Sequence, residues 1–318
     1  MKAIIPALIA LLLIGCILPP GPPPTAMIQA SPVHPPFATA GATVVPAAPP
    51  ATPPAAEPTP AFIGRISPAD YMPQVHVPAG TFRMGGLDVR AEDDELPAHD
   101  LQMRAFWMDK LEVTNGMYAL CMQAGACEPP VLPSSNERPG YFGNPEFQDY
   151  PVVHVTWESA RSYCAWAGRR LPTEAEWERA ARGDDLRTWP WGDEPPDGRF
   201  ANFGWLTGDT SRVGSYAAGA GPFGALDMAG NVWEWTTDLY NGEYYLVSPT
   251  SNPVGPPDTG GNTRRVIRGG SFEDVDTDIR ISNRGFELGP DPRAPATKPQ
   301  LQAGNESFKI GFRCAADE

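Results

Sequence analysis

Two carboxylates flank a turn-forming stretch in the second half of the chain, where Asp227 and Glu234 lie on either side of Gly230. Calcium in proteins is bound by carboxylate and carbonyl oxygens, and a glycine lets the backbone curl so that neighbouring carbonyls converge. Trp233 and Trp235 would anchor such a loop in the core. The spacing is therefore compatible with a calcium site. It is equally compatible with a buried turn whose acids cap backbone amides.

A second group of charged residues follows the Gly-Gly-Ser run at 269–271. It comprises four acids and two arginines: Glu273, Asp274, Asp276, Asp278, Arg280 and Arg284. One interpretation is a carboxylate site for a hard cation or a basic ligand, with the arginines as counter-charges. The alternative is an exposed acidic loop beside arginines that pair with acids and brace backbone carbonyls. Charge runs are usually solvated, which favours the alternative, and the same holds for the Glu-Asp-Asp-Glu run at 92–95.

Overall composition excludes several classes of protein. The 318 residues carry a formal net charge of -14, without the basic patch that a nucleic-acid binder needs. The chain has no Gly-x-Ser-x-Gly elbow, His-Glu-x-x-His helix, Cys-x-x-Cys pair or P-loop. We therefore expect no nucleic-acid partner.

The N-terminus is typical of a targeting segment. Lys2 precedes an apolar run at 4–14 that is too short to span a bilayer, and Leu-Ile-Gly at 13–15 leads into Cys16. This resembles the lipobox of bacterial lipoproteins, in which the cysteine is acylated. We expect 1–16 to be a lipoprotein signal peptide, and Cys16 to anchor the chain to a bacterial membrane on its extracytoplasmic side. The alternative is an ordinary cleaved signal peptide with a chance cysteine.

The next segment, 17–61, is rich in proline, alanine and threonine and carries one formal charge, at Glu57. Such a sequence cannot bury a core, and its prolines favour extended polyproline II. We expect a disordered, semi-rigid stalk followed by one folded domain over 62–318.

Regular elements are expected at a few places in this domain. Helices are expected after Thr114, after Thr156 and after Thr173, which with Glu176 forms a capping box. Strand, turn and strand are expected over 75–84, and short strands at 266–268, 279–281 and 310–312. The long intervening segments are rich in glycine and proline.

Four cysteines remain in the folded part. In a chain that has left the cytosol, the even number predicts disulfides. Three pairings are possible, and the short spacing of Cys121 and Cys127 suggests a local loop, which leaves Cys164 to join Cys314. Free buried thiols are the alternative.

Several motifs together resemble the formylglycine-generating enzyme, or sulfatase-modifying factor, family. The longest is 163–183, which contains Leu-Pro-Thr-Glu-Ala-Glu-Trp at 171–177. The others are Glu-Val-Thr-Asn at 112–115, the stretch 226–235, Arg-Gly-Gly-Ser-Phe at 268–272, and Ile-Gly-Phe-Arg-Cys-Ala-Ala-Asp at 310–317. They follow the family's order, and the resemblance covers about 75–317.

The resemblance implies an α+β fold: a single compact domain with little regular secondary structure, related to C-type lectins. It also implies two structural calcium ions. The first would be bound by Asp227, Gly230, Val232 and Glu234, and the second by Asn202, Phe203, Asp209 and Ser211. In the family the Asp227 position carries asparagine. The family also has a helix-to-C-terminus disulfide that falls on Cys164 and Cys314.

The resemblance fails where the family's oxidation chemistry takes place. The family's enzymes hold copper(I) with two cysteines, and soft thiolates are the ligands that copper(I) selects. Those positions fall on Asp274 and Ile279 here, so we expect no copper. The expected function is a membrane-anchored binding or accessory module. Its groove, formed by Trp233, Ser271, Asp274 and Arg280, would hold a peptide, glycan or protein. The alternative is an oxidoreductase or protein-modifying enzyme that uses a different metal.

Overall fold

The computed structural model describes residues 64–291, 293–294, 297 and 304–318. The predicted signal peptide, Cys16 and the whole of the predicted stalk lie outside these residues. Within the described part, no helix is long and apolar enough to cross a membrane.

The described residues contain three α-helices, each at a place that the capping residues predict. They are α1 (Asn115–Gln123), α2 (Trp157–Trp166) and α3 (Glu174–Arg182). The side chains of Thr114, Thr156 and Thr173 each accept a hydrogen bond from a backbone N–H in the first turn of the helix that follows. The predicted helix starts and the Thr173–Glu176 capping box are therefore confirmed.

The described strands form two four-stranded sheets and one two-stranded hairpin. The first sheet has the order β1-β2-β5-β10, and the second has the order β8-β7-β6-β9. β3 and β4 form the hairpin. The bounds are β1 Gly64–Ile66, β2 Pro73–Val77, β3 Gly80–Met84, β4 His99–Met103, β5 Phe106–Asp109, β6 Trp233–Leu239, β7 Arg264–Arg268, β8 Arg284–Leu288, β9 Ile310–Gly311 and β10 Ala315–Asp317.

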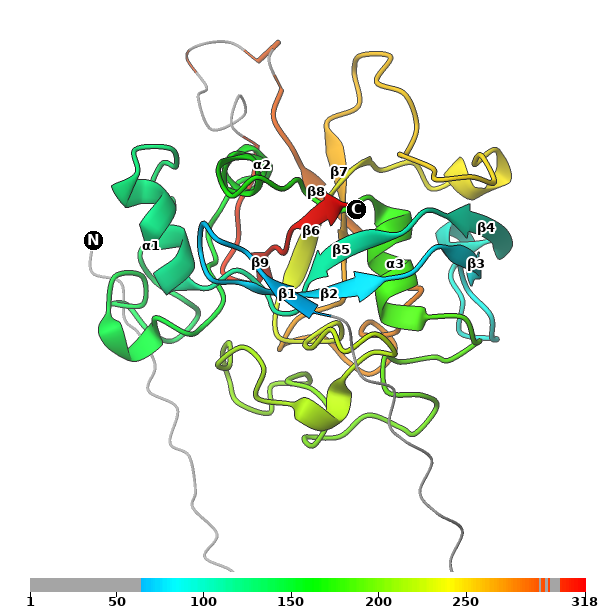
Figure 1. Ribbon diagram of the computed structural model, residues 1–318, viewed down its shortest axis with the longest axis horizontal. Helices are drawn as coiled ribbons and strands as arrows, with labels where there is room; N and C mark the ends of the chain where they lie inside the picture. Colours follow the sequence, from blue (N-terminus) through cyan, green and yellow to red (C-terminus); the bar gives the residue numbers. More distant parts are fainter. Residues whose placement is uncertain (1–63, 292, 295–296, 298–303) are drawn as a thin grey trace, which may run out of the picture. The chain divides into compact units, whose positions relative to one another are not determined.

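The segment 310–317 contributes to both sheets. β9 pairs with β6 in the only parallel pairing between described strands, and β10 pairs antiparallel with β5 a few residues later. Between the two strands, Cys314 joins Cys164 of α2. Figure 1 shows this red segment running across the centre of the domain. Both predicted disulfides are present, since Cys121 also joins Cys127 across the end of α1.

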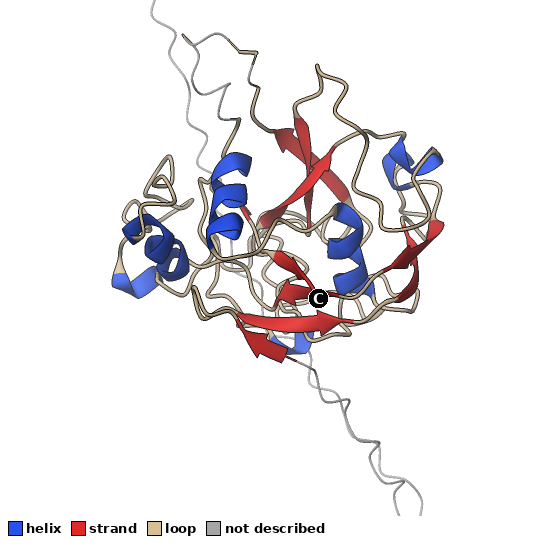
Figure 2. Cartoon of the chain, turned by 45° about the horizontal axis from the view of Figure 1, so that its top comes forward, coloured by secondary structure: helices blue, strands red, loops and turns tan. Residues whose placement is uncertain are grey.

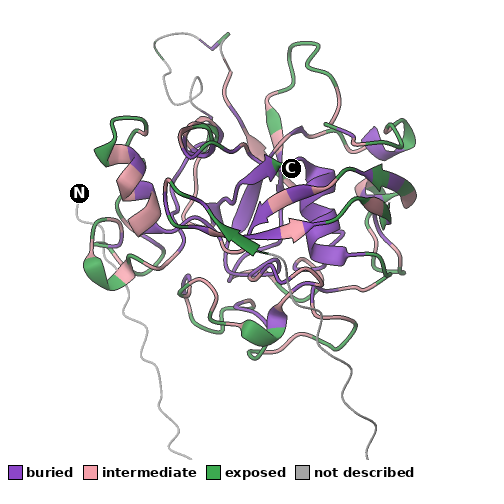
Figure 3. Ribbon diagram, viewed as in Figure 1, coloured by how far each residue is buried: buried purple, intermediate pink, exposed green. Residues whose placement is uncertain are grey.

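Loops form most of the remaining domain, as Figure 2 shows. The buried residues concentrate around α3 and the central strands, where Trp177, Trp235 and Phe312 are fully buried (Figure 3). The domain therefore has an extensive buried core although it contains little regular secondary structure.

One predicted strand is wrong. The alternation Ile279-Arg280-Ile281 forms turns, in which the Ile279 N–H bonds to the Val275 carbonyl. Both isoleucines are buried, but they belong to different apolar clusters. Arg280 between them is buried too, through its pairing with Glu95, so only the residue types alternate here and the burial does not. A period of two in the sequence cannot distinguish such a buried loop from a strand.

Candidate functional site

The turn before β6 has an unusual backbone. Asp227, Gly230 and Asn231 have φ angles of 56°, 76° and 63°, all in the left-handed region. A Cβ on Gly230 would lie 2.3 Å from the Asn202 carbonyl oxygen, so glycine is required. The left-handed residues bring the 202 loop and the 227–234 turn into contact.

Glu234 is committed to partners inside the protein. Its carboxylate accepts two hydrogen bonds of 2.7 Å from Arg313, at Nε and Nη2, and one of 2.8 Å from the Trp177 indole. All three side chains are buried. Bidentate pairing of this kind is the strongest form of arginine–carboxylate contact.

Two further carboxylates lie nearby without a cation of their own. Glu112 accepts a 2.7 Å hydrogen bond from the Asn231 amide, and Asp227 accepts one from the Gly214 N–H. Burial, followed by the charges of Asp227 and Glu234, raises the pKa of Glu112 well above its ordinary value. Burial also raises the pKa of Asp227 to about 6. Three buried acids therefore face one buried guanidinium, that of Arg313.

This arrangement is compatible with part of the first predicted calcium site. A divalent cation would offset the excess negative charge, and among the described residues the Gly230 carbonyl accepts no hydrogen bond. Glu234 fits less well because Arg313 and Trp177 already use its oxygens. No group of three or more His, Cys, Asp or Glu side chains in the described residues is arranged to hold a metal. The predicted set has only two such side chains.

The second predicted set also comes together in space. The Asn202 amide donates to the Asp209 carbonyl at 2.9 Å, and Ser211 Oγ lies 3.1 Å from Asn231 Oδ1. The Asp209 carboxylate accepts hydrogen bonds from Ser135 Oγ at 2.6 Å and from a backbone N–H at 2.9 Å. Its oxygens are thus already shared with the 135–138 segment.

The predicted groove residues divide into two groups. Trp233, Ser271 and Asp274 lie together: Asp274 Oδ2 accepts from the Trp233 indole at 2.8 Å, the Ser271 N–H at 2.8 Å and the Ser271 hydroxyl at 2.5 Å. Arg280 instead forms a bidentate pair with buried Glu95, at 2.7 and 2.9 Å.

Two of the other charged residues of this loop, Arg284 and Glu273, have structural partners as well. Arg284 binds Glu174 of α3 through Nε at 2.7 Å and Nη2 at 3.0 Å. Glu273 pairs with Lys309. Asp276 is exposed. Ile279, at the second cysteine position of the family, is fully buried among apolar side chains.

Sequence reasoning assigned no role to three residues of this region. Glu112 and Arg313 lie inside quoted family motifs, and Asn231 follows the predicted ligand Gly230. Asn231 lies between the predicted ligands Gly230 and Val232 and connects them to the second set, because its Oδ1 accepts from the Ser211 N–H and its own N–H donates to the Asn202 carbonyl. The available signal for Glu112 and Arg313 was a charged residue directly between two apolar neighbours.

The fold and this site define a small α+β domain in which a buried carboxylate–arginine cluster braces loops. The chain belongs to the sulfatase-modifying factor family, since residues 65–318 match the sulfatase-modifying factor enzyme 1-like domain. The expected family and α+β fold class are thereby confirmed.

Individual relatives agree with this membership. The chain is 34% identical over 317 residues to the formylglycine-generating enzyme of Streptomyces coelicolor, covering 82% of this chain and 93% of that protein. It is 35% identical over 232 residues to the hercynine oxygenase of Mycobacterium tuberculosis, covering 64% of this chain and 54% of that protein. The structure of PvdO from Pseudomonas aeruginosa superposes with a TM-score of 0.64 at 28% identity, covering 83% of this chain and all (100%) of that one.

Proposed function

We propose that this chain is an extracytoplasmic lipoprotein whose calcium-stabilised domain binds a peptide, glycan or protein and does not oxidise cysteine with copper. The observation that carries the proposal is the chemistry at the family's two cysteine positions. Asp274 there is tied to Trp233 and Ser271, and Ile279 is buried. All cysteines of the described residues are in disulfides, so they offer copper(I) no thiolate pair.

The binding role is supported by how Asp274 is held. Three hydrogen bonds fix one of its oxygens, beside the nearly buried Trp233. A rigid carboxylate next to an indole is a suitable contact for a polar ligand group. Arg280 is not needed for this site, because it pairs with Glu95.

The anchor and compartment are inferred from the lipobox at Cys16 and the proline-rich stalk. The disulfides of the domain are consistent with this inference, because disulfides persist outside the reducing cytosol.

A second candidate is an enzyme that uses another metal. It is favoured by the relatives, which are named as a formylglycine-generating enzyme and a hercynine oxygenase. Carboxylates such as Asp274 bind harder metals than copper(I).

Elemental analysis of the full-length chain, purified with disulfides intact and without chelator, tests the two candidates. Stoichiometric calcium without copper or iron would support the binding module. Stoichiometric copper or iron would overturn it and favour the enzyme.

Removal of calcium provides a second measurement. If free calcium is about 100-fold above its dissociation constant, a chelator should lower the free energy of unfolding by about 2.7 kcal/mol. Asp227→Asn, which keeps an oxygen ligand, should retain the calcium response, whereas Asp227→Ala should lose it. An unchanged melting temperature after chelation of the wild type would contradict the calcium assignment.

A further inference from the structure

Two open pockets lie side by side at Tyr240, the residue that follows β6. One has a volume of about 520 Å³ and is lined by the loop after β6 and the start of β7. The other has a volume of about 630 Å³ and is lined by residues 91–94 and the start of β8. Tyr240 lines both, and neither contains Trp233, Ser271 or Asp274. We call the two together the Tyr240 groove.

The larger pocket is electronegative. Glu92 and Asp93 line it, and among the described residues neither side chain has a hydrogen-bond or ion-pair partner. Asp94 accepts a 2.7 Å hydrogen bond from the Tyr240 hydroxyl. Arg284 also lines this pocket, but its guanidinium binds Glu174 and the Asp94 carbonyl, so it leaves the charges of Glu92 and Asp93 uncompensated. The pocket therefore favours a cation.

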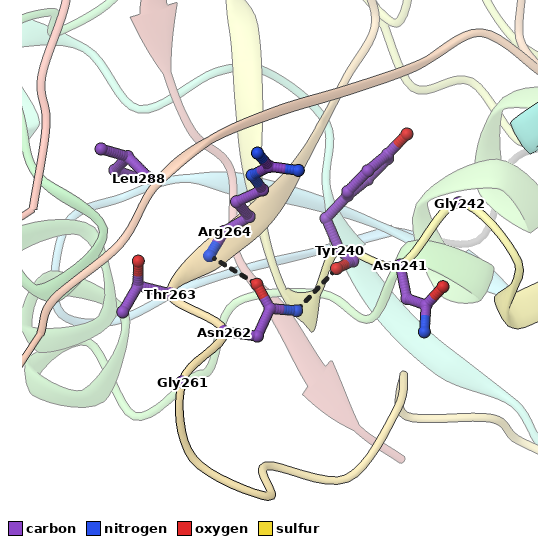
Figure 4. A pocket seen from close by; sticks show the side chains of 8 residues that line it. All are labelled: Tyr240, Asn241, Gly242, Gly261, Asn262, Thr263, Arg264 and Leu288. Atoms are coloured by element: carbon purple, nitrogen blue, oxygen red, sulfur yellow. Dashed lines mark hydrogen bonds between the residues drawn. The ribbon is translucent and has the colours of Figure 1, made fainter.

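The smaller pocket has the opposite character. Arg264 is exposed, and its guanidinium has no hydrogen-bonding or carboxylate partner among the residues that the structure describes. Figure 4 shows its side chain rising beside that of Tyr240. Asn262 fixes the backbone of the two residues relative to each other, because its Nδ2 donates to the Tyr240 carbonyl at 2.7 Å and its Oδ1 accepts from the Arg264 N–H at 3.1 Å. A free guanidinium on a fixed wall suits a carboxylate.

Aromatic rings and an edge strand connect the two pockets. The Tyr240 and Phe286 rings lie 4.5 Å apart, and the Arg264 guanidinium lies 4.5 Å from the centre of the Phe286 ring. Phe286 belongs to β8, whose partner among the described strands is β7 on one side alone. The N–H and carbonyl of Leu288, at the end of β8, already bond to Glu287 Oε1 and the Asn305 N–H. An extended segment laid along β8 would therefore pair with the main chain before Leu288, around Phe286, which is the mode of strand addition.

We propose that the Tyr240 groove binds an extended peptide segment of a partner protein that carries a basic and an acidic residue. The basic side chain enters the pocket of Glu92 and Asp93, and the carboxylate binds Arg264. The aromatic pair supports the peptide between these charges. The assignment gives a role to the 92–95 acidic run, of which only Glu95 is fully buried. It does not depend on calcium or on Asp274.

The test uses the full-length chain and four labelled synthetic peptides, with binding followed by fluorescence anisotropy. One peptide carries a lysine and a glutamate, two carry either charge with glutamine at the other position, and the fourth carries neither. The doubly charged peptide should bind tightest. Each neutralisation should weaken binding about fivefold, and added salt should reduce the differences.

Variants assign each charge to its pocket. Arg264→Gln should abolish the preference for glutamate and keep the preference for lysine, whereas the double variant Glu92→Gln, Asp93→Asn should do the reverse. The control Arg161→Gln makes the same charge change on α2, where Arg161 pairs with Glu158 at the surface, and should change neither preference. Equal binding of all four peptides, absence of binding, or preferences unaltered by the groove variants would overturn the proposal.

Discussion

Glu174 is buried at the start of α3, where its carboxylate binds Arg284 and lies near Arg268. Glu178, one turn further on, binds Arg268 and Arg182. Three buried arginines thus share two acids of a single helix. Removal of one partner from such a network is strongly unfavourable, because it leaves an uncompensated charge inside the protein.

Glu174→Gln should therefore lower the free energy of unfolding at pH 7 by about 3–5 kcal/mol. Urea unfolding of the variant and the wild type measures this difference. Glu158→Gln removes a carboxylate from a surface pair and should change stability by less than about 0.5 kcal/mol. Equal effects of the two substitutions would contradict the role of the network.

Glu174 should also make the stability of the domain depend on pH. Burial alone would raise the pKa of Glu174, but the charges of Arg284 and Arg268 outweigh burial and hold the pKa below its ordinary value of 4.5. A lowered folded-state pKa contributes stability that is complete above pH 4.5 and is lost as the pH falls through the folded-state pKa. Between pH 5 and pH 2 the wild type should therefore lose more stability than Glu174→Gln. Parallel curves for the two proteins would be evidence against this assignment.

Residue roles could be predicted only where the motif itself contains the partners. Trp233, Ser271 and Asp274 were expected together and do lie together. The pairing of Arg280 with Glu95 spans 185 positions, and no local pattern predicts it. The sequence thus indicated which residues are charged, but not that most of the arginines between 268 and 313 bind acids or carbonyls inside the fold.

Among the secondary-structure elements, α3 has the clearest local signal. Thr173 Oγ1 accepts from the Glu176 N–H at 3.1 Å, and Glu176 Oε2 accepts from the Thr173 N–H at 2.9 Å. Capping residues act through adjacent backbone, so sequence alone located all three helices. Strands are less predictable, as the loop at 279–281 illustrates. Its apolar–polar–apolar sequence looks like a strand, although the two isoleucines pack into separate clusters.

Thr173→Ala should lower the free energy of unfolding by about 1 kcal/mol, since the first turn of α3 loses its cap. Thr173→Ser keeps the hydroxyl and should remain close to the wild type. Chemical denaturation of the three proteins measures both effects. If serine and alanine destabilise equally, the hydroxyl contributes nothing and the loss arises from the threonine methyl group.

For the whole domain, the two disulfides contribute unequally. Cys164–Cys314 closes a sequence separation of 150 residues, whereas Cys121–Cys127 closes one of 6. The chain-entropy account gives about 5 and about 2 kcal/mol for these closures, both as upper limits. The pairing itself was predicted from cysteine spacing and from the expected compartment, both of which are inferred without a structure.

Replacing Cys164 and Cys314 with alanine should therefore lower the melting temperature more than replacing Cys121 and Cys127 with serine. Differential scanning calorimetry of the two double variants makes the comparison. A larger fall in melting temperature after loss of Cys121–Cys127 would indicate that this short disulfide at α1 limits the stability of the domain. The long disulfide Cys164–Cys314 would then contribute less than the chain-entropy account predicts.

The arrangement of β9, Arg313, Cys314 and β10 has a consequence for biosynthesis. These residues complete both four-stranded sheets, close the long disulfide and supply the guanidinium that neutralises Glu234. A nascent chain in which residues 304–318 are still inside the ribosome contains the sequences of α1, α2 and α3 but lacks a strand of each four-stranded sheet. The two sheets of this domain are therefore completed only after those residues emerge. Until then the growing polypeptide leaves a sheet edge and the buried Glu234 without their partners, so we expect it to depend on chaperones and a chain truncated before residue 304 to be poorly folded.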